Sequence, residues 1–306
     1  MRAIDKFYPR TLFIISLFIG LTATALAQSG NVAVTGGRRT VTLNVIVHAP
    51  EGQRVTKDDF GLYDSGIPQE IESFTPLDKG SRIVLMVDSS SNLKADADAL
   101  QAAMLAVVNE LYEDDQMMVV GYHESAEIIE DMTGDLTKLQ AATKKLIRKG
   151  FPNLFDALIA VSDSFAQQAA TGFEKRVIIL ISDGYDSESK TKFDEALYAL
   201  QDNNIVLYAL QVADRTRGAL LRDKPKPPAA LEKLTTGTGG AIFQFKDAAQ
   251  AAKLLADEVR KNWYRLTYTP SGVNPINSRN ILLMPHVKEV ALRTKGSHPG
   301  RYRRQY

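Results

Sequence analysis

A run of apolar residues that ends abruptly in hard oxygen ligands constrains this chain most. Residues 82–88 are Arg-Ile-Val-Leu-Met-Val-Asp, and three serines and Asn92 follow. The apolar residues are continuous rather than alternating, which predicts a parallel strand buried on both faces. A second such run, residues 177–184, ends in Ser-Asp-Gly, with Asp183 in the equivalent place. Because ligands bind beyond the carboxyl ends of the strands in open α/β sheets, we expect both aspartates in one crevice.

Carboxylate and hydroxyl oxygens in one crevice are typical of a site for Mg²⁺ or a similar oxygen-seeking cation. Each residue also has a simpler interpretation. Asp88 can begin a turn, Asn92 can cap the helix that follows, and Ser90 can be an ordinary loop serine. The joint occurrence of these residues with Asp183, after a second apolar strand, favours a site.

These motifs resemble the von Willebrand factor type A (vWA) domain and its metal-ion-dependent adhesion site. In that family D-x-S-x-S follows the first strand, a Thr lies on a later loop, and an Asp follows the fourth strand. Asp88, Ser90 and Asp183 match. The second Ser is Asn92 here, whose carbonyl oxygen can still serve. The Thr position, just before Leu-Phe-Asp-Ala, holds Pro152, which has no side-chain oxygen.

The resemblance implies a Mg²⁺ ion held by the side chains of Asp88, Ser90, Asn92 and Asp183. It also implies a protein ligand, whose acidic side chain would complete the coordination of the metal. The loss at Pro152 implies weak metal binding, and we expect Pro152→Thr to strengthen it. Without a cation, the paired carboxylates should raise the pKa of one of them.

The whole chain is expected to form an α/β fold with a small β-sandwich subdomain. Strands alternate with helical patterns from Arg82 to Trp263, which predicts a doubly wound, mostly parallel sheet. Residues 41–47 alternate as a half-buried strand, and residues 264–269, 280–284 and 287–293 predict more strands. This order resembles the VWFA-related family first noted in acidobacterial genomes, which implies a sandwich built from both chain ends. The expected segments are a signal peptide (1–27), an N-terminal β segment (28–80), a vWA domain (81–263) and a C-terminal β segment (264–306).

The first 27 residues predict export. Three basic residues precede an apolar run that ends in Ala-Leu-Ala, a pattern typical of a cleaved secretory signal peptide. An uncleaved membrane anchor is the alternative, because the run of 17 residues from Thr11 to Ala27 is near the lower limit for a bilayer span. The chain has no cysteine, which excludes disulfides, thiolate metal sites and a lipoprotein anchor. We expect a bacterial protein that is periplasmic or secreted.

Charge and motif content exclude several classes of function. Residues 28–306 hold 34 basic and 35 acidic side chains, which indicates no nucleic-acid or membrane partner. No Gly-x-Ser-x-Gly motif is present, and Ser90 stands where a phosphatase of the haloacid dehalogenase type needs its second acid. The sequence therefore predicts an exported, non-catalytic protein-binding or adhesion module with a degenerate metal site. A metal-independent scaffold of the same fold and a metal-dependent phosphohydrolase remain the alternatives.

Overall fold

The computed structural model describes residues 40–167, 175–219 and 223–300. The predicted signal peptide therefore lies outside the described residues. Everything described belongs to one compact unit that begins at Arg38. None of the helices in these three ranges is long and apolar enough to cross a membrane.

A six-stranded sheet with strand order β10-β9-β8-β5-β6-β7 forms the centre of the α/β domain. Only its edge strand β7 is antiparallel to its neighbour. The prediction of a doubly wound, mostly parallel sheet is thus confirmed. The strands are β5 (Ser81–Asp88), β6 (Gln116–Tyr122), β7 (Ala126–Thr133), β8 (Lys175–Ser182), β9 (Ile205–Gln211) and β10 (Ile242–Gln244).

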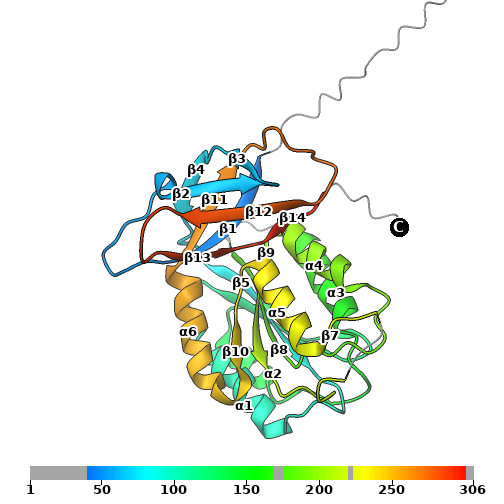
Figure 1. Cartoon of the computed structure of the whole chain (residues 1–306). Coiled ribbons are helices and arrows are strands. Elements are labelled where there is room, and N and C mark those ends of the chain that lie inside the picture. The colour runs from blue at the N-terminus through cyan, green and yellow to red at the C-terminus, as the bar shows by residue number, and fades with distance from the viewer. Residues whose placement is uncertain (1–39, 168–174, 220–222, 301–306) are drawn as a thin grey trace, which may run out of the picture. The chain divides into compact units, whose positions relative to one another are not determined.

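Helices cover both faces of this sheet because alternate residues of each strand point to opposite sides. Ile83, Leu85 and Val87 pack with α1, α2 and α6, whereas Val84 and Met86 pack with α3, α4 and α5. Figure 1 shows α1 and α6 on one side of the sheet and α3, α4 and α5 on the other. The helices are α1 (Ala97–Asn109), α2 (Leu136–Ala142), α3 (Leu154–Gln167), α4 (Phe193–Asp202), α5 (Pro227–Thr238) and α6 (Ala248–Lys261), with 3₁₀ turns η1 (Lys57–Asp59) and η2 (Phe245–Asp247).

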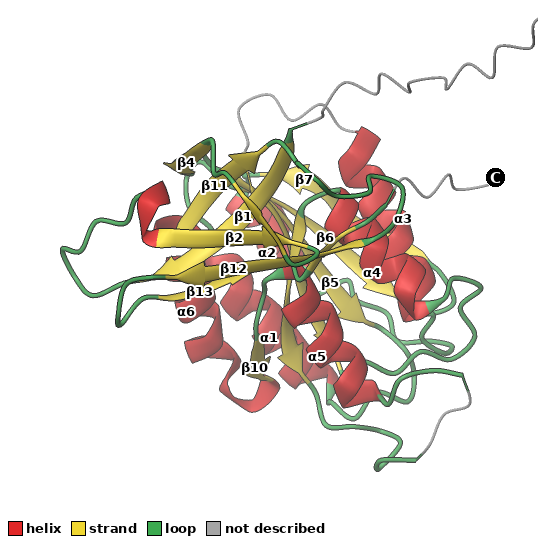
Figure 2. Cartoon of the chain, turned by 45° about the horizontal axis from the view of Figure 1, so that its top comes forward, coloured by secondary structure: helices red, strands yellow, loops and turns green. Residues whose placement is uncertain are grey.

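Both chain ends contribute to each of two further sheets, which share one apolar core and confirm the predicted sandwich. One sheet has the order β13-β1-β11-β4 and the other β14-β12-β2-β3. Figure 2 shows β2 and β12 side by side. The strands are β1 (Val41–His48), β2 (Phe60–Asp64), β3 (Ile67–Gln69), β4 (Ser73–Pro76), β11 (Trp263–Tyr268), β12 (Arg279–Pro285), β13 (Ala291–Thr294) and β14 (Ser297–His298).

Three local predictions differ from the structure. Strand β1 is buried on both faces rather than half-buried, because Ile46 packs into the core of the α/β domain. The spacing of Leu136, Leu139 and Leu146 predicts one helix, but α2 ends at Ala142, where Lys144 N–H and Lys145 N–H donate to carbonyls three residues back and close the last turn. The polar composition of residues 214–228 predicts a loop, but α5 already begins at Pro227, since proline is preorganised for the first helical turn.

Glu258 on α6 joins the sandwich to the α/β domain. Its carboxylate accepts a hydrogen bond from Tyr208 Oη of β9 at 2.7 Å and a short one from Arg293 of β13. His48 Nε2 of β1 lies 2.8 Å from its other oxygen. The side chain of Glu258 is only 10% exposed, so these partners replace the water that its charge would otherwise require.

Replacing Glu258 should therefore loosen the junction. We expect Glu258→Ala to lower the free energy of unfolding by about 2 kcal/mol, because it leaves the buried hydroxyl of Tyr208 without its acceptor and breaks the links to Arg293 and His48. The matched control is Asp257→Ala on the same helix, whose exposed carboxylate pairs with the exposed Lys261 and should contribute well under about 1 kcal/mol. Equal effects of the two substitutions in urea denaturation would contradict this role.

Lys295, between β13 and β14, makes a second link to the α/β domain. Its ammonium donates to Gln201 O at 2.9 Å and to Asn204 Oδ1 at 2.6 Å, at the end of α4. Burial lowers the pKa of Lys295 from 10.5 to about 7, and the Arg279 charge adds to this, while Asp202 opposes it. The folded protein therefore releases this proton at a lower pH than the unfolded chain does.

This shift predicts a pH dependence of stability. Between about pH 7 and about pH 10 the unfolded chain holds a proton that the folded protein has lost, so the free energy of unfolding should rise with pH. We expect a rise on the order of 3 kcal/mol across this window, measured by urea denaturation, and its loss in Lys295→Met. The exposed Lys288→Met is the control and should keep the rise.

Candidate functional site

Four predicted site residues, Asp88, Ser90, Asn92 and Asp183, converge at the carboxyl edge of the central sheet. Asp88 is the last residue of β5, and Asp183 directly follows the adjacent parallel strand β8. Neither aspartate has any exposed surface. Asn92 does not cap α1, because the helix begins only at Ala97. The sequence placed this cluster correctly, but the group at its centre was not predicted.

That group is the guanidinium of Arg215, from the loop after β9. Its Nε donates to Asp183 Oδ2 at 2.7 Å, and its Nη2 donates to Asp183 Oδ1 at 2.9 Å, which makes a two-point pair with one carboxylate. Nη2 also donates to Asp88 Oδ2. Nη1 donates to Ser90 Oγ at 2.8 Å and to Asn92 Oδ1 at 2.5 Å. All five N–H donors of the guanidinium are thus used, and its side chain is only 6% exposed.

Backbone groups hold the two carboxylates in place. Asp88 Oδ1 accepts from the amide of Ser90 at 2.9 Å and from its hydroxyl at 2.5 Å. Asp183 accepts from the amides of Tyr185 and Arg215, each at 3.0 Å. Gly184 has a φ of +84°, and an added Cβ would lie 2.3 Å from the carbonyl oxygen of Pro227, so the turn after Asp183 requires glycine.

The loop that carries Arg215 is itself fixed. Val212 N–H donates to Ser182 O at 2.9 Å, which extends the pairing of β8 with β9. The Asp214 carboxylate accepts from the amide and hydroxyl of Thr216 at 2.7 Å each, and its carbonyl accepts from Lys94 Nζ at 2.7 Å. The Arg215 guanidinium also lies 5.2 Å from the ring centre of Tyr185, within range of a cation–π contact.

The charges of the site are mutually dependent. Burial raises the pKa of Asp88, the Arg215 charge and the bonds from Ser90 oppose that rise, and the Asp183 charge adds to it. The expected repulsion between the carboxylates is therefore present but smaller than the effect of burial. Burial alone would lower the pKa of Arg215, but the hydrogen bonds that it donates to Asp183 and the charges of both aspartates raise that pKa above its ordinary value.

A second arginine, Arg148, fixes the backbone of the loop after β5. Its guanidinium donates to four carbonyl oxygens: Ala95 and Leu93 at 2.7 Å, Ser91 at 3.2 Å and Ser90 at 3.3 Å. Lys149 N–H donates to Ser89 O, and Ser91 N–H donates to Gly150 O. The loop that bears Ser90 and Asn92 is consequently held by the segment that precedes α3.

A family model for the von Willebrand factor type A domain matches residues 83–257, more than half of the chain. The chain belongs to this family. No curated protein sequence matches this chain significantly. The match covers strands β5 to β10, and with them Asp88, Asp183 and the loop of Arg215.

Several solved structures are similar to this chain at low sequence identity. A von Willebrand factor type A protein from Catenulispora acidiphila is 12% identical, with a TM-score of 0.48 over 82% of this chain and 75% of that one. An aerotolerance-related membrane protein from Bacteroides fragilis is 15% identical, with a TM-score of 0.45 over 59% and 98% of the two chains. The PilB minor pilin from Streptococcus sanguinis is 12% identical, with a TM-score of 0.44 over 60% and 62%.

As arranged, the vWA site fits a guanidinium rather than Mg²⁺. The oxygens expected to ligate the metal all accept hydrogen bonds from Arg215, whose planar donors lie where a compact cation would have to sit. Within the described ranges, no group of three or more His, Asp or Glu residues is placed to hold a metal ion. Metal binding by Asp88, Ser90, Asn92 and Asp183 stays a prediction, and it would require Arg215 to leave.

The loop that should supply the missing Thr is occupied by packing and backbone bonds. Pro152 is buried, and its carbonyl accepts from Ser187 N–H at 2.7 Å. The Asn153 side chain bridges the Glu124 carbonyl and the Glu188 amide, so it gives no oxygen to the site. A signal for Arg215 did exist in the sequence: a basic residue follows the strand next to the Asp183 strand, at the same sheet edge.

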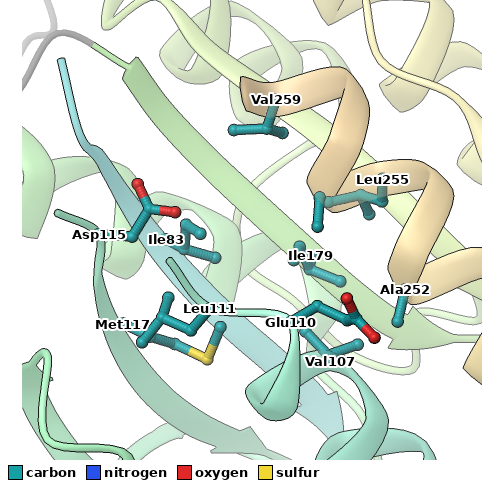
Figure 3. Close-up of a pocket in the computed structure, with 11 residues that line it drawn as sticks. Ile83, Val107, Glu110, Leu111, Asp115, Met117, Ile179, Ala252, Leu255 and Val259 are labelled. Carbon is teal, nitrogen blue, oxygen red and sulfur yellow. The ribbon is translucent and has the colours of Figure 1, made fainter. Parts of the chain in front are cut away.

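A small cavity of about 20 Å³ lies far along the sheet from these residues, between α1 and α6 (Figure 3). Ile83, Met117 and Ile179 from the strands and Leu255 and Val259 from α6 line it, with Asp115 and Glu110 at its edges. Its volume holds at most one water molecule. This cavity is a packing defect of the core rather than a ligand site.

The Arg148 contacts predict a specific effect on the site loop. Arg148→Ala should lower the free energy of unfolding by about 2 kcal/mol, since four carbonyls lose a charged donor. It should also speed amide exchange at Ser91, because the loop bearing that residue opens more often. The exposed Lys144→Ala, on the same segment, is the control. Unchanged exchange at Ser91 would show that Arg148 does not fix the loop.

Proposed function

We propose that this vWA chain is an exported, non-catalytic protein-binding module that binds its partner without a metal ion. The observation that supports this is the Arg215 guanidinium, which satisfies the side chains expected to hold the metal. A bound partner cannot add an acidic side chain to this cluster, because every N–H of the Arg215 guanidinium already has an acceptor. The net charge of Asp88, Asp183 and Arg215 is also already negative, so a further carboxylate would be repelled. The partner therefore binds beside the cluster rather than through it.

The burial and hydrogen bonding of Asp88 and Asp183 support a non-catalytic function. A general acid or base must reach a substrate within hydrogen-bond distance. Asp88 and Asp183 have no exposed surface, and every carboxylate oxygen accepts at least one hydrogen bond from Arg215 or Ser90. Neither carboxylate can exchange a proton with a substrate while Arg215 remains in place, which argues against the phosphohydrolase alternative.

The proposed binding face is the segment 143–153 at the rim of the site. The side chains of Ile147 and Phe151 in this segment are 70% and 59% exposed, which is unusual for large apolar residues. The backbone of this segment is fixed to Ser89 and Ser91, so the two apolar side chains are presented without much loss of entropy on binding. For a metal-independent scaffold the sequence also suggests contact through the loops at Pro152 and at residues 224–228, but Pro152 is buried and Lys224 is held by Asp186 at 2.6 Å.

Partner capture from the envelope fraction of the producing bacterium tests this proposal. Phe151→Ser combined with Ile147→Ser should reduce capture about tenfold or more, because two exposed apolar anchors are lost. Ile276→Ser is the control, since Ile276 is 67% exposed but belongs to the sandwich. Capture should be equal in Mg²⁺ and in excess chelator. Loss of capture in chelator would favour the metal-dependent module instead, and equal capture by all variants would exclude this face.

A further inference from the structure

We infer that Arg215 is a tethered substitute for a divalent cation, and that it covers a latent cation site formed by Asp88, Ser90, Asn92 and Asp183. The geometry carries this inference independently of any protein partner. Two carboxylates without exposed surface lie on adjacent strands and share one partner. Burying such charges is costly unless an opposite charge and hydrogen bonds compensate them. Arg215 supplies both.

The departures of this chain from the family motif suit a guanidinium. Asn92 Oδ1 accepts from Nη1 at 2.5 Å, so the residue that replaces the second serine of the motif is used by the guanidinium. Pro152 supplies no oxygen, and none is needed, because the five N–H donors are already accepted by four side chains. Arginine also matches the carboxylate of Asp183 at two points, which a lysine ammonium cannot do.

The covalent attachment of Arg215 to the chain explains why its guanidinium would occupy the site in preference to a divalent cation from solution. Arg215 follows β9 by only four residues, and its loop is fixed by Asp214, Thr216 and Val212. Its guanidinium is therefore held near the carboxylates at a high effective concentration. A free cation can bind only the fraction of molecules in which Arg215 has left, so its apparent affinity falls by that fraction.

Removing the side chain should expose the latent site. Arg215→Ala leaves two buried carboxylates that repel each other, and hard oxygens in such a cluster suit Mg²⁺ or Mn²⁺. We expect Arg215→Ala to bind Mg²⁺ at least about tenfold more tightly than the unaltered protein, as measured by calorimetric titration. Its thermal midpoint should fall relative to the unaltered protein and recover when millimolar Mg²⁺ is added. The midpoint of the unaltered protein should respond neither to Mg²⁺ nor to chelator.

Matched variants separate the possible results. Arg217→Ala removes an exposed arginine from the same loop and should behave like the unaltered protein. Arg215→Ala with Asp88→Asn should lose the gained Mg²⁺ affinity, which would locate the ion at this cluster. If Arg215→Ala is unstable, Arg215→Gln keeps part of the packing and takes its place in the titration.

Two results would overturn the inference. Equal Mg²⁺ affinity of the unaltered protein and of folded Arg215→Ala would show that Arg215 does not compete with the ion. No Mg²⁺ or Mn²⁺ binding by any folded Arg215 variant would show that the cluster is not a cation site. The first result would also remove the support for metal-independent binding, whereas neither result bears on whether Ile147 and Phe151 contact a protein partner, which the capture experiment decides.

Discussion

The parallel pairing of β5 with β8 brings Asp88 and Asp183 to the same sheet edge, where neither carboxylate reaches solvent. Two negative charges in that position require a positive charge, and the rest of the edge is organised around supplying it. The loop after β9 brings Arg215, and the segment before α3 brings Arg148, which fixes the loop that bears Ser90 and Asn92. One electrostatic requirement thus ties together loops from four separate parts of the domain.

The sequence was sufficient for the architecture because the fold depends on regular patterns. Continuous apolar runs such as residues 83–87 occur where helices cover both faces of a sheet, and this identified the central strands. The exception at β1 has a clear cause. The alternation of apolar and polar residues in β1 predicted that one face of the strand is exposed to solvent. Ile46 lies on that face, but it packs against the core of the α/β domain. Tertiary contacts of this kind do not change the residue periodicity of the strand, so its sequence cannot predict them.

The site was predictable only as far as strand ends are predictable. Asp88, Ser90, Asn92 and Asp183 could be placed because each lies within four residues of a strand end. Arg215 lies equally close to the end of β9, but the direction of its side chain depends on the path of the loop, which turns such as the one made by Asp214 with Thr216 determine. Arg148 lies on an irregular segment, far from any strand end. Residue type also misled, since the same oxygen-bearing side chains can coordinate a metal ion or accept hydrogen bonds from a guanidinium.

The sandwich has a consequence for the order in which the chain can fold. Among the strands of the described residues, β1 pairs with β11 and β13, both more than 200 residues later, and β2 pairs with its hairpin partner β3 and with β12. During synthesis, both edges of β1 and the β12-facing edge of β2 therefore stay unpaired until almost the whole chain has been made. Exposed edges of apolar strands invite association with other chains. A chain that stops before Trp263 would retain the central sheet but leave β1 without any strand to pair with.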